Sequence, residues 1–163
     1  METHGLMVNT IQTAGSIDKL EAFLLNGEHF DLPISHEFTE NEYVRGMYAP
    51  AGTIVVGHKH NQDTVNVMLR GKAIVRSGDE LMELVAPAYF ISKPNDRKAA
   101  FVVEDLVWIN VHSNPYGIPE TEEEKIETIQ KLEDKYISKS QTFIEHEAKS
   151  LSEDIISLKE DSQ

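Results

Sequence analysis

The sequence predicts a mainly β protein: an antiparallel β-barrel or jelly roll with a short helix before it and a helical tail after it. Short apolar runs recur at about ten-residue spacing through the middle of the chain, with no helical pattern between them. Glycine, proline, asparagine and aspartate separate these runs, as turns between strands require. After residue 118 the strand-like runs stop and the chain becomes strongly acidic. We therefore divide the chain into a lead-in (1–30), a β-barrel (31–118) and an acidic helical tail (119–163).

Composition limits the classes of function. The 163 residues carry a formal net charge of -13 and include no cysteine. General binding to nucleic acid or to an anionic membrane surface is excluded, because phosphate would be repelled. Disulfides, zinc fingers and thiol nucleophiles are excluded as well. The first 30 residues lack a basic start followed by an apolar run, and no apolar stretch is long enough to span a bilayer. We expect a cytoplasmic protein.

The lead-in contains one predicted helix, from Ile17 to Leu25. Ser16 can cap its first turn, and Asn26-Gly27 can end it. Its apolar residues recur at helical spacing, so we expect it to lie on the barrel.

The barrel segment contains eight predicted strands: Tyr43–Tyr48, Thr53–Val56, Thr64–Leu69, Lys72–Arg76, Leu81–Val85, Ala88–Ile91, Ala99–Val103 and Leu106–His112. Turns are predicted between them, including one at Arg70-Gly71 and one at Glu104-Asp105.

The run Thr64–Leu69 alternates in character. Val65, Val67 and Leu69 share one face, and Thr64, Asn66 and Met68 share the other. A strand with one apolar and one more polar face fits the wall of a barrel whose interior is wet or holds a ligand.

The tail holds 13 acidic and 6 basic residues. Thr121 and the acidic run Glu122–Glu124 predict a helix start, because negative charge suits the first turn. The predicted apolar stripe of this helix is Ile126, Ile129, Leu132 and Tyr136. A second stripe follows after a break near Ser138–Ser140: Phe143, Ala148, Leu151, Ile155 and Leu158. Each stripe needs a partner, either the barrel or another copy of the chain.

The strongest local signal is a histidine pair, His58 and His60, between Gly52 and Gly71. Histidines at i and i+2 on an extended segment place both imidazoles on one face of a sheet. That geometry suits two ligands of one divalent metal ion.

This stretch resembles the first motif of the cupin superfamily, which runs glycine, His-x-His, glutamate, glycine. Gly52, His58, His60 and Gly71 fall in register, whereas Thr64 stands at the glutamate position with Asp63 one residue earlier. The second cupin motif is degraded. Ala88 stands at its first glycine, Pro94 at its proline, Asp96 at its second glycine, Ala99 at its histidine and Val103 at its asparagine. Residues 91–94 and 107–115 also resemble small cupin-like proteins found in bacteriophage genomes.

The resemblance implies a pocket at the barrel mouth. Its expected metal ligands are His58 and His60, with His112 or Asp63 as a third, and the ion would be iron, manganese, nickel or zinc. Further polar candidates for binding a ligand are Asn66, Arg45 and Glu83. Alternatively, the barrel has lost its metal and the histidine pair is an exposed turn. No catalytic residue is assigned.

Three functions remain open at the level of sequence. The first is a metal-dependent enzyme acting on a small molecule. The second is a non-catalytic barrel that binds or sequesters a small molecule, and the resemblance to phage proteins implies that a phage encodes it. The third is a structural or assembly protein acting through its C-terminal helices. A homodimer or higher homo-oligomer is the default expectation, because pairing protects a sheet edge.

Overall fold

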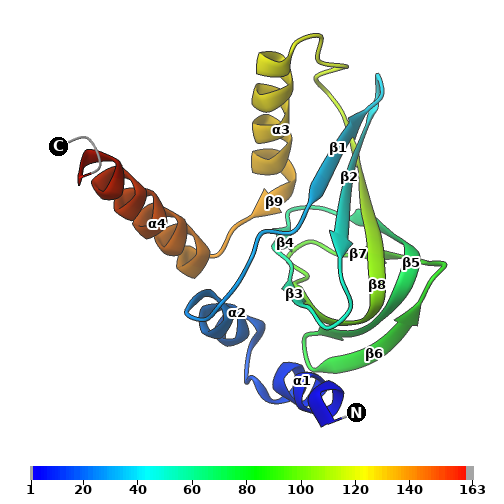
Figure 1. Ribbon diagram of the computed structural model, residues 1–163. Coiled ribbons are helices and arrows are strands. Elements are labelled where there is room, and N and C mark those ends of the chain that lie inside the picture. The colour runs from blue at the N-terminus through cyan, green and yellow to red at the C-terminus, as the bar shows by residue number, and fades with distance from the viewer. Residues whose placement is uncertain (1, 161–163) are drawn as a thin grey trace.

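A computed structural model describes the backbone of residues 2–160 and the side chains of residues 5–151 (Figure 1). The elements follow in the order α1 (Glu2–Thr13), α2 (Ile17–Leu25), β1 (Ile34–Phe38), β2 (Glu42–Ala49), β3 (Ile54–Val56), β4 (Lys59–His60), β5 (Thr64–Ser77), β6 (Glu80–Val85), β7 (Ala88–Ser92), β8 (Lys98–Ser113), α3 (Glu122–Tyr136), β9 (Ile137–Ser138) and α4 (Gln141–Glu160). The fold is the predicted one: antiparallel strands form a barrel with helices before and after it.

Two long strands, β5 and β8, build both walls of the barrel. Because each strand bends midway, the seven strands form one continuous sheet that folds back on itself. One half, called here the first sheet, has the order β1-β2-β8-β5-β7, and the other half, called the second sheet, has the order β3-β8-β5-β6. All pairings are antiparallel.

The sequence predicted turns where these two strands bend. Gly71 lies inside β5 with a φ of +96°, at a point where the pairing with β8 shifts register. A Cβ at this position would lie 2.7 Å from the Glu104 carbonyl oxygen and closer still to that of Asp105. Gly71 and the Glu104-Asp105 pair therefore mark bends within continuous strands. Two predicted strands form β5, and two others form β8.

Four elements were not predicted. Helix α1 precedes the predicted helix, β1 pairs with β2, and the two-residue strands β4 and β9 pair with each other. The predicted helix is confirmed as α2. Its predicted cap is confirmed as well, because the Ser16 side chain accepts a hydrogen bond from Lys19 N at 3.2 Å.

Helices α1 and α2 cover the outer face of the second sheet. Ile11, Ile17 and Leu20 from the helices pack against Ala99 and Phe101 of β8, and all five side chains are buried. The part of the second sheet that lies under these helices is therefore buried on both faces. This burial uses apolar residues from the lead-in and fixes the helices to the barrel.

The guanidinium of Arg76 ties α1 to the barrel. It donates hydrogen bonds to the carbonyl oxygens of Ile11 and Gly15, each at 2.9 Å, and to that of Gly78 at 2.8 Å. The two carbonyls of α1 and its following turn lie where a helix leaves acceptors unpaired, so a buried cation is well placed there.

The tail closes one end of the barrel. Thr121 caps α3 by accepting from Glu124 N at 3.1 Å, as predicted. Leu132 and Tyr136 are buried against Tyr43 of β2. The predicted stripe needs one correction: Ile126 is 68% exposed, and Thr128 lies in the buried face instead.

After α3 the chain forms a short strand across the barrel mouth. β9 pairs with β4, which carries His60 (Figure 1). Ser140 then contacts Glu21 of α2. In the second predicted stripe, Leu151 is exposed, and Ile155 and Leu158 lie outside the described side chains. No helix in the described part of the chain is long and apolar enough to cross a membrane.

Candidate functional site

A cavity of about 110 Å³ lies inside the barrel. Its walls come from β2, β5, β7, β8 and the segment around β4, with Ile137 of β9 at its edge. A volume of this size holds roughly three or four water molecules, at about 30 Å³ each. A second cavity of about 370 Å³ adjoins it under α3 and α4. Arg45, His58 and Ile137 line both cavities.

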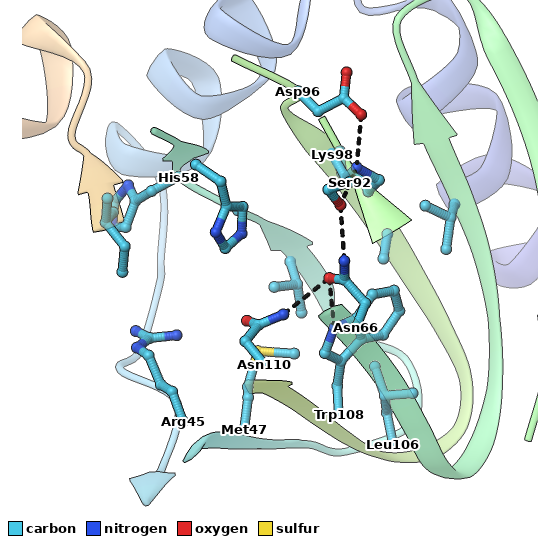
Figure 2. Close-up of a pocket in the computed structure, with 17 residues that line it drawn as sticks. Arg45, Met47, His58, Asn66, Ser92, Asp96, Lys98, Leu106, Trp108 and Asn110 are labelled. Atoms are coloured by element: carbon cyan, nitrogen blue, oxygen red, sulfur yellow. Dashed lines mark hydrogen bonds and ion pairs between the residues drawn. The ribbon is translucent and has the colours of Figure 1, made fainter. Parts of the chain in front are cut away.

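Asn66 is the centre of the polar wall (Figure 2). Its amide nitrogen donates to the Ser92 hydroxyl at 2.8 Å and to the Thr64 carbonyl at 2.9 Å. Its amide oxygen accepts from Trp108 Nε1 at 3.2 Å and from Asn110 Nδ2 at 2.9 Å. These four bonds use the full capacity of a carboxamide. Asn66 therefore positions its neighbours and supplies the acceptor for the Trp108 N–H.

A lysine extends this network. Lys98 Nζ donates to the Ser92 hydroxyl at 2.8 Å and lies 3.5 Å from the Asp96 carboxylate. Burial lowers the pKa of Lys98, and the Asp96 carboxylate opposes this shift. The ammonium group thus faces the cavity with one carboxylate beside it.

A second cation faces the same cavity. Arg45 on β2 lies on the other side of the pocket from Lys98 and Asn66 in Figure 2. Its Nε lies 3.4 Å from a carboxylate oxygen of Glu133 on α3. This ion pair links the barrel wall to the tail helix. Arg45 and Lys98 together bring two positive charges to one cavity in a chain whose net charge is -13.

His58 and His60 both line the inner cavity. The buried Nδ1 atom of each ring has no hydrogen-bond partner among the described residues. Burial lowers the pKa of His58, and burial together with the cations Lys98 and Arg45 lowers that of His60 to about 4. Both imidazoles are therefore neutral at pH 7, and each offers the cavity one unused nitrogen.

His112 is buried but lies outside the lining of the inner cavity. Its ring stacks on Tyr136 with a centroid separation of 4.5 Å, and the His60 ring lies 5.9 Å away. Neither ring nitrogen has a partner among the described residues. Burial lowers the pKa of His112 to about 4, so this imidazole is neutral too.

Two other predicted site residues lie away from the cavity. Asp63 is exposed and pairs with Lys93 at 3.0 Å. Glu83 on β6 is exposed and pairs with Lys72 at 3.0 Å. In each case the carboxylate faces solvent and already has a cationic partner. The structure thus brings His58, His60, Asn66 and Arg45 together, places His112 beside them, and leaves these two carboxylates outside.

The donor set does not fit a resident metal ion. Within the described part of the chain, no group of three His, Asp or Glu side chains is arranged to hold one ion. Structural zinc sites use four protein ligands, and catalytic sites use three. The two histidines that face the cavity fall short of this number, because Asp63 is turned away and His112 is stacked between aromatic rings.

Sequence reasoning missed the roles of Ser92, Lys98 and Asn110. A signal for Asn110 was available, because Leu106, Trp108, Asn110 and His112 lie at every second position of one strand and therefore share one of its faces. For Lys98 and Ser92 no local signal exists. Their contact depends on the pairing of β7 with β5 and of β5 with β8, which brings distant segments together.

No protein-family model matches this chain, and no curated protein matches it. Solved structures do. A protein from Klebsiella pneumoniae with a double-stranded β-helix domain is 18% identical, with 63% of this chain and 90% of that one covered and a TM-score of 0.46. An RmlC-like cupin family protein from Methanocaldococcus jannaschii is 12% identical, with 53% and 83% covered and a TM-score of 0.44. A cupin superfamily protein from Desulfitobacterium hafniense is 14% identical, with 56% and 85% covered and a TM-score of 0.44.

The class of fold rests on the chain's own topology. The two halves of one antiparallel sheet share β5 and β8, and helices flank them. This is a mainly β, antiparallel barrel with two helices before it and a helical tail after it.

Proposed function

We propose that this chain is a non-catalytic binding barrel for a small organic anion, with a carboxylate as the group it recognises. The observation that carries the proposal is the charge of the inner cavity. Arg45 and Lys98 line it together, and Asp96 is the one acidic residue of its lining. A cation excess inside a strongly acidic protein favours an anionic ligand, because the low local dielectric strengthens the attraction.

The neutral histidines also support an anionic ligand. At pH 7 His58 and His60 add no charge, and their unused Nδ1 atoms can exchange hydrogen bonds with a carboxylate or a hydroxyl group of the ligand. A ligand that satisfies these buried nitrogens removes the free-energy cost of leaving them unpaired.

The two adjoining cavities set the size of the ligand. The inner one accommodates a carboxylate group with one or two further atoms. The outer one, beside Phe143 and Ile144, accommodates the remainder. Together they reach the range of roughly 300–1,000 Å³ that small-molecule sites occupy.

Binding rather than catalysis is favoured by how the polar wall is built. Asn66 has no free hydrogen-bonding capacity, and the Ser92 hydroxyl already accepts from both Asn66 and Lys98. The described donors do not assemble a metal site. Sequestration by a phage-encoded protein stays a prediction from sequence resemblance.

The test is calorimetric titration of the full chain with matched pairs of ligands: acetate against acetamide, and succinate against succinamide. We expect binding of the anions and at least tenfold weaker binding of the amides. Lys98→Met should weaken anion binding by roughly tenfold to a hundredfold, because a charge-assisted hydrogen bond contributes about 1.5–3 kcal/mol. The matched control is Lys93→Met, which removes an exposed ammonium outside the cavity.

Equal affinity for anion and amide would contradict the proposal, as would unchanged affinity in Lys98→Met. Elemental analysis of the untagged protein decides the metal question separately. One equivalent of iron, manganese, nickel or zinc that is lost in a His58→Ala/His60→Ala variant would replace this proposal with the metal-dependent one.

A further inference from the structure

The two sheets of the barrel differ in what covers their outer faces. On the second sheet, Phe101 of β8 is 3% exposed, because Ile11, Ile17 and Leu20 of the helices lie over it. On the first sheet, the outward residues are equally apolar. There Tyr89 of β7 is 82% exposed and its neighbour Ile91 is 50% exposed.

Strand register places these outward residues in continuous rows. One row runs across four strands through Val44, Val111, Val65 and Ile91. The next row runs through Ile109, Val67 and Tyr89, with Gly46 at its end on β2. We call the outer surface made by these two rows, together with Tyr48 and Leu69 beside them, the bare face. An antiparallel sheet that faces water normally alternates apolar with polar residues, and the bare face does not.

The bare face is large enough for an interface. Its five most exposed side chains are those of Tyr48, Val65, Leu69, Tyr89 and Ile91, each at least 38% exposed. They present on the order of 500 Å² of mainly apolar surface, taking roughly 200 Å² for a whole aromatic side chain and less for an aliphatic one. With the half-buried residues of both rows, the area approaches the ~800 Å² that each partner contributes to a standard interface.

The lack of charge on the bare face allows a second copy of this chain to occupy it. A protein with a net charge of -13 repels its own copies wherever carboxylates meet. The two rows of the bare face contain no charged residue between β2 and β7. Charges lie at its margin: Arg70 beside Leu69, Glu37 opposite Val44 on β1, and the ion pair of Asp63 with Lys93. An uncharged apolar centre with a polar rim is the anatomy of a protein interface.

We infer that two copies of this chain form a two-fold symmetric dimer by packing the bare face of one against the bare face of the other. The contact is face to face between sheets, as in a β-sandwich, and so differs from the edge pairing expected from the sequence. Tyr89, the most exposed aromatic residue of the face, is its principal anchor.

The experiment is sedimentation equilibrium of the full chain over a range of micromolar concentrations, with far-ultraviolet circular dichroism as a check of folding. Wild type should show twice the chain mass of 18.4 kDa. Tyr89→Glu should weaken the dimer by a hundredfold or more, because it removes an aromatic anchor and buries two like charges. Since Tyr89 is 82% exposed, this substitution leaves the barrel core intact.

Ile126→Glu is the matched control. Ile126 on α3 is 68% exposed and belongs to the tail, so the same new charge there should leave the dimer unchanged. Ile91→Lys tests the face with a charge of opposite sign and should also give monomers. A monomeric wild type, or a dimer that survives both bare-face variants, would overturn the inference. A dimer lost in Ile126→Glu alone would assign assembly to the tail helix instead.

Discussion

The substitution Asn66→Ala removes the residue that holds three strands together around the cavity. Asn66 is 3% exposed, and its oxygen accepts from Trp108 Nε1 and Asn110 Nδ2. Truncation leaves both donors without their partner. Each buried unpaired donor costs about 1–3 kcal/mol, so the free energy of unfolding should fall by roughly 2–5 kcal/mol. At about 2–4 °C per kcal/mol for a chain of this size, the melting temperature should fall by roughly 5–15 °C.

Urea unfolding followed by tryptophan fluorescence measures this loss, and Trp108 is the sole tryptophan of the chain. The emission of the folded variant should also change, because the indole N–H loses its acceptor. Asn9→Ala, on the exposed side of α1, is the control and should stay within about 0.5 kcal/mol of wild type. If the free energy of unfolding falls as little in Asn66→Ala as in the control, the reasoning is refuted, since the hydrogen bonds of Asn66 would then contribute nothing to stability.

Two further predictions concern the pH dependence of stability and the backbone strain at two glycines. The pKa values of His60 and His112 are lowered to about 4, so the unfolded chain, with pKa values near 6.5, binds more protons between these two values. The contribution of these two imidazoles to the free energy of unfolding should therefore be complete above pH 6.5 and be lost as the pH drops from 6.5 to 4. The fall should be shallower in His60→Gln/His112→Gln, and an unchanged slope in that variant would contradict the assignment. Gly71→Ala should cost several kcal/mol in urea unfolding, because a Cβ there meets two backbone carbonyls at a φ of +96°. Gly52→Ala, at a φ of +88° with open space around it, should cost only the strain of about 1–2 kcal/mol, and equal losses in the two variants would show that the collision is relieved.

Local sequence patterns predicted most of the strands because each strand shows its own alternation or apolar run. They failed at Gly71, since a glycine with positive φ is equally typical of a turn and of a bend within a strand. β1 was missed because it is a short strand at the edge of the sheet, so its alternation of half-buried and exposed residues covers only five positions. The face of α3 was misread at Ile126, because the barrel presents its apolar surface to Leu132 and Tyr136 and leaves the first turns of the helix in solvent.

The candidate site was predictable only in part, for a physical reason. His58 and His60 were selected by their spacing, Asn66 was one of three further polar candidates, and all three line the cavity. Lys98 and Ser92 became part of the site through strand pairing, which no local pattern encodes. Asp63 was chosen because it stands one residue before the glutamate position of the motif, and Glu83 was chosen as a polar residue; both carboxylates face solvent and pair with lysines.

The tail's position has a consequence for how the chain acquires its structure during synthesis. Tyr43 and His112 lie at the barrel mouth and are covered by Tyr136, while Ser140 contacts Glu21 near the other end of the chain. A nascent chain that has left the ribosome only as far as β8 has all strands of the two main sheets but an open mouth, with these rings in water. Final closure of the barrel is therefore a late event, completed when α3 and β9 emerge. Premature termination within α3 would yield a barrel that keeps the strands of its main sheet but lacks Tyr136 and β9 over its mouth.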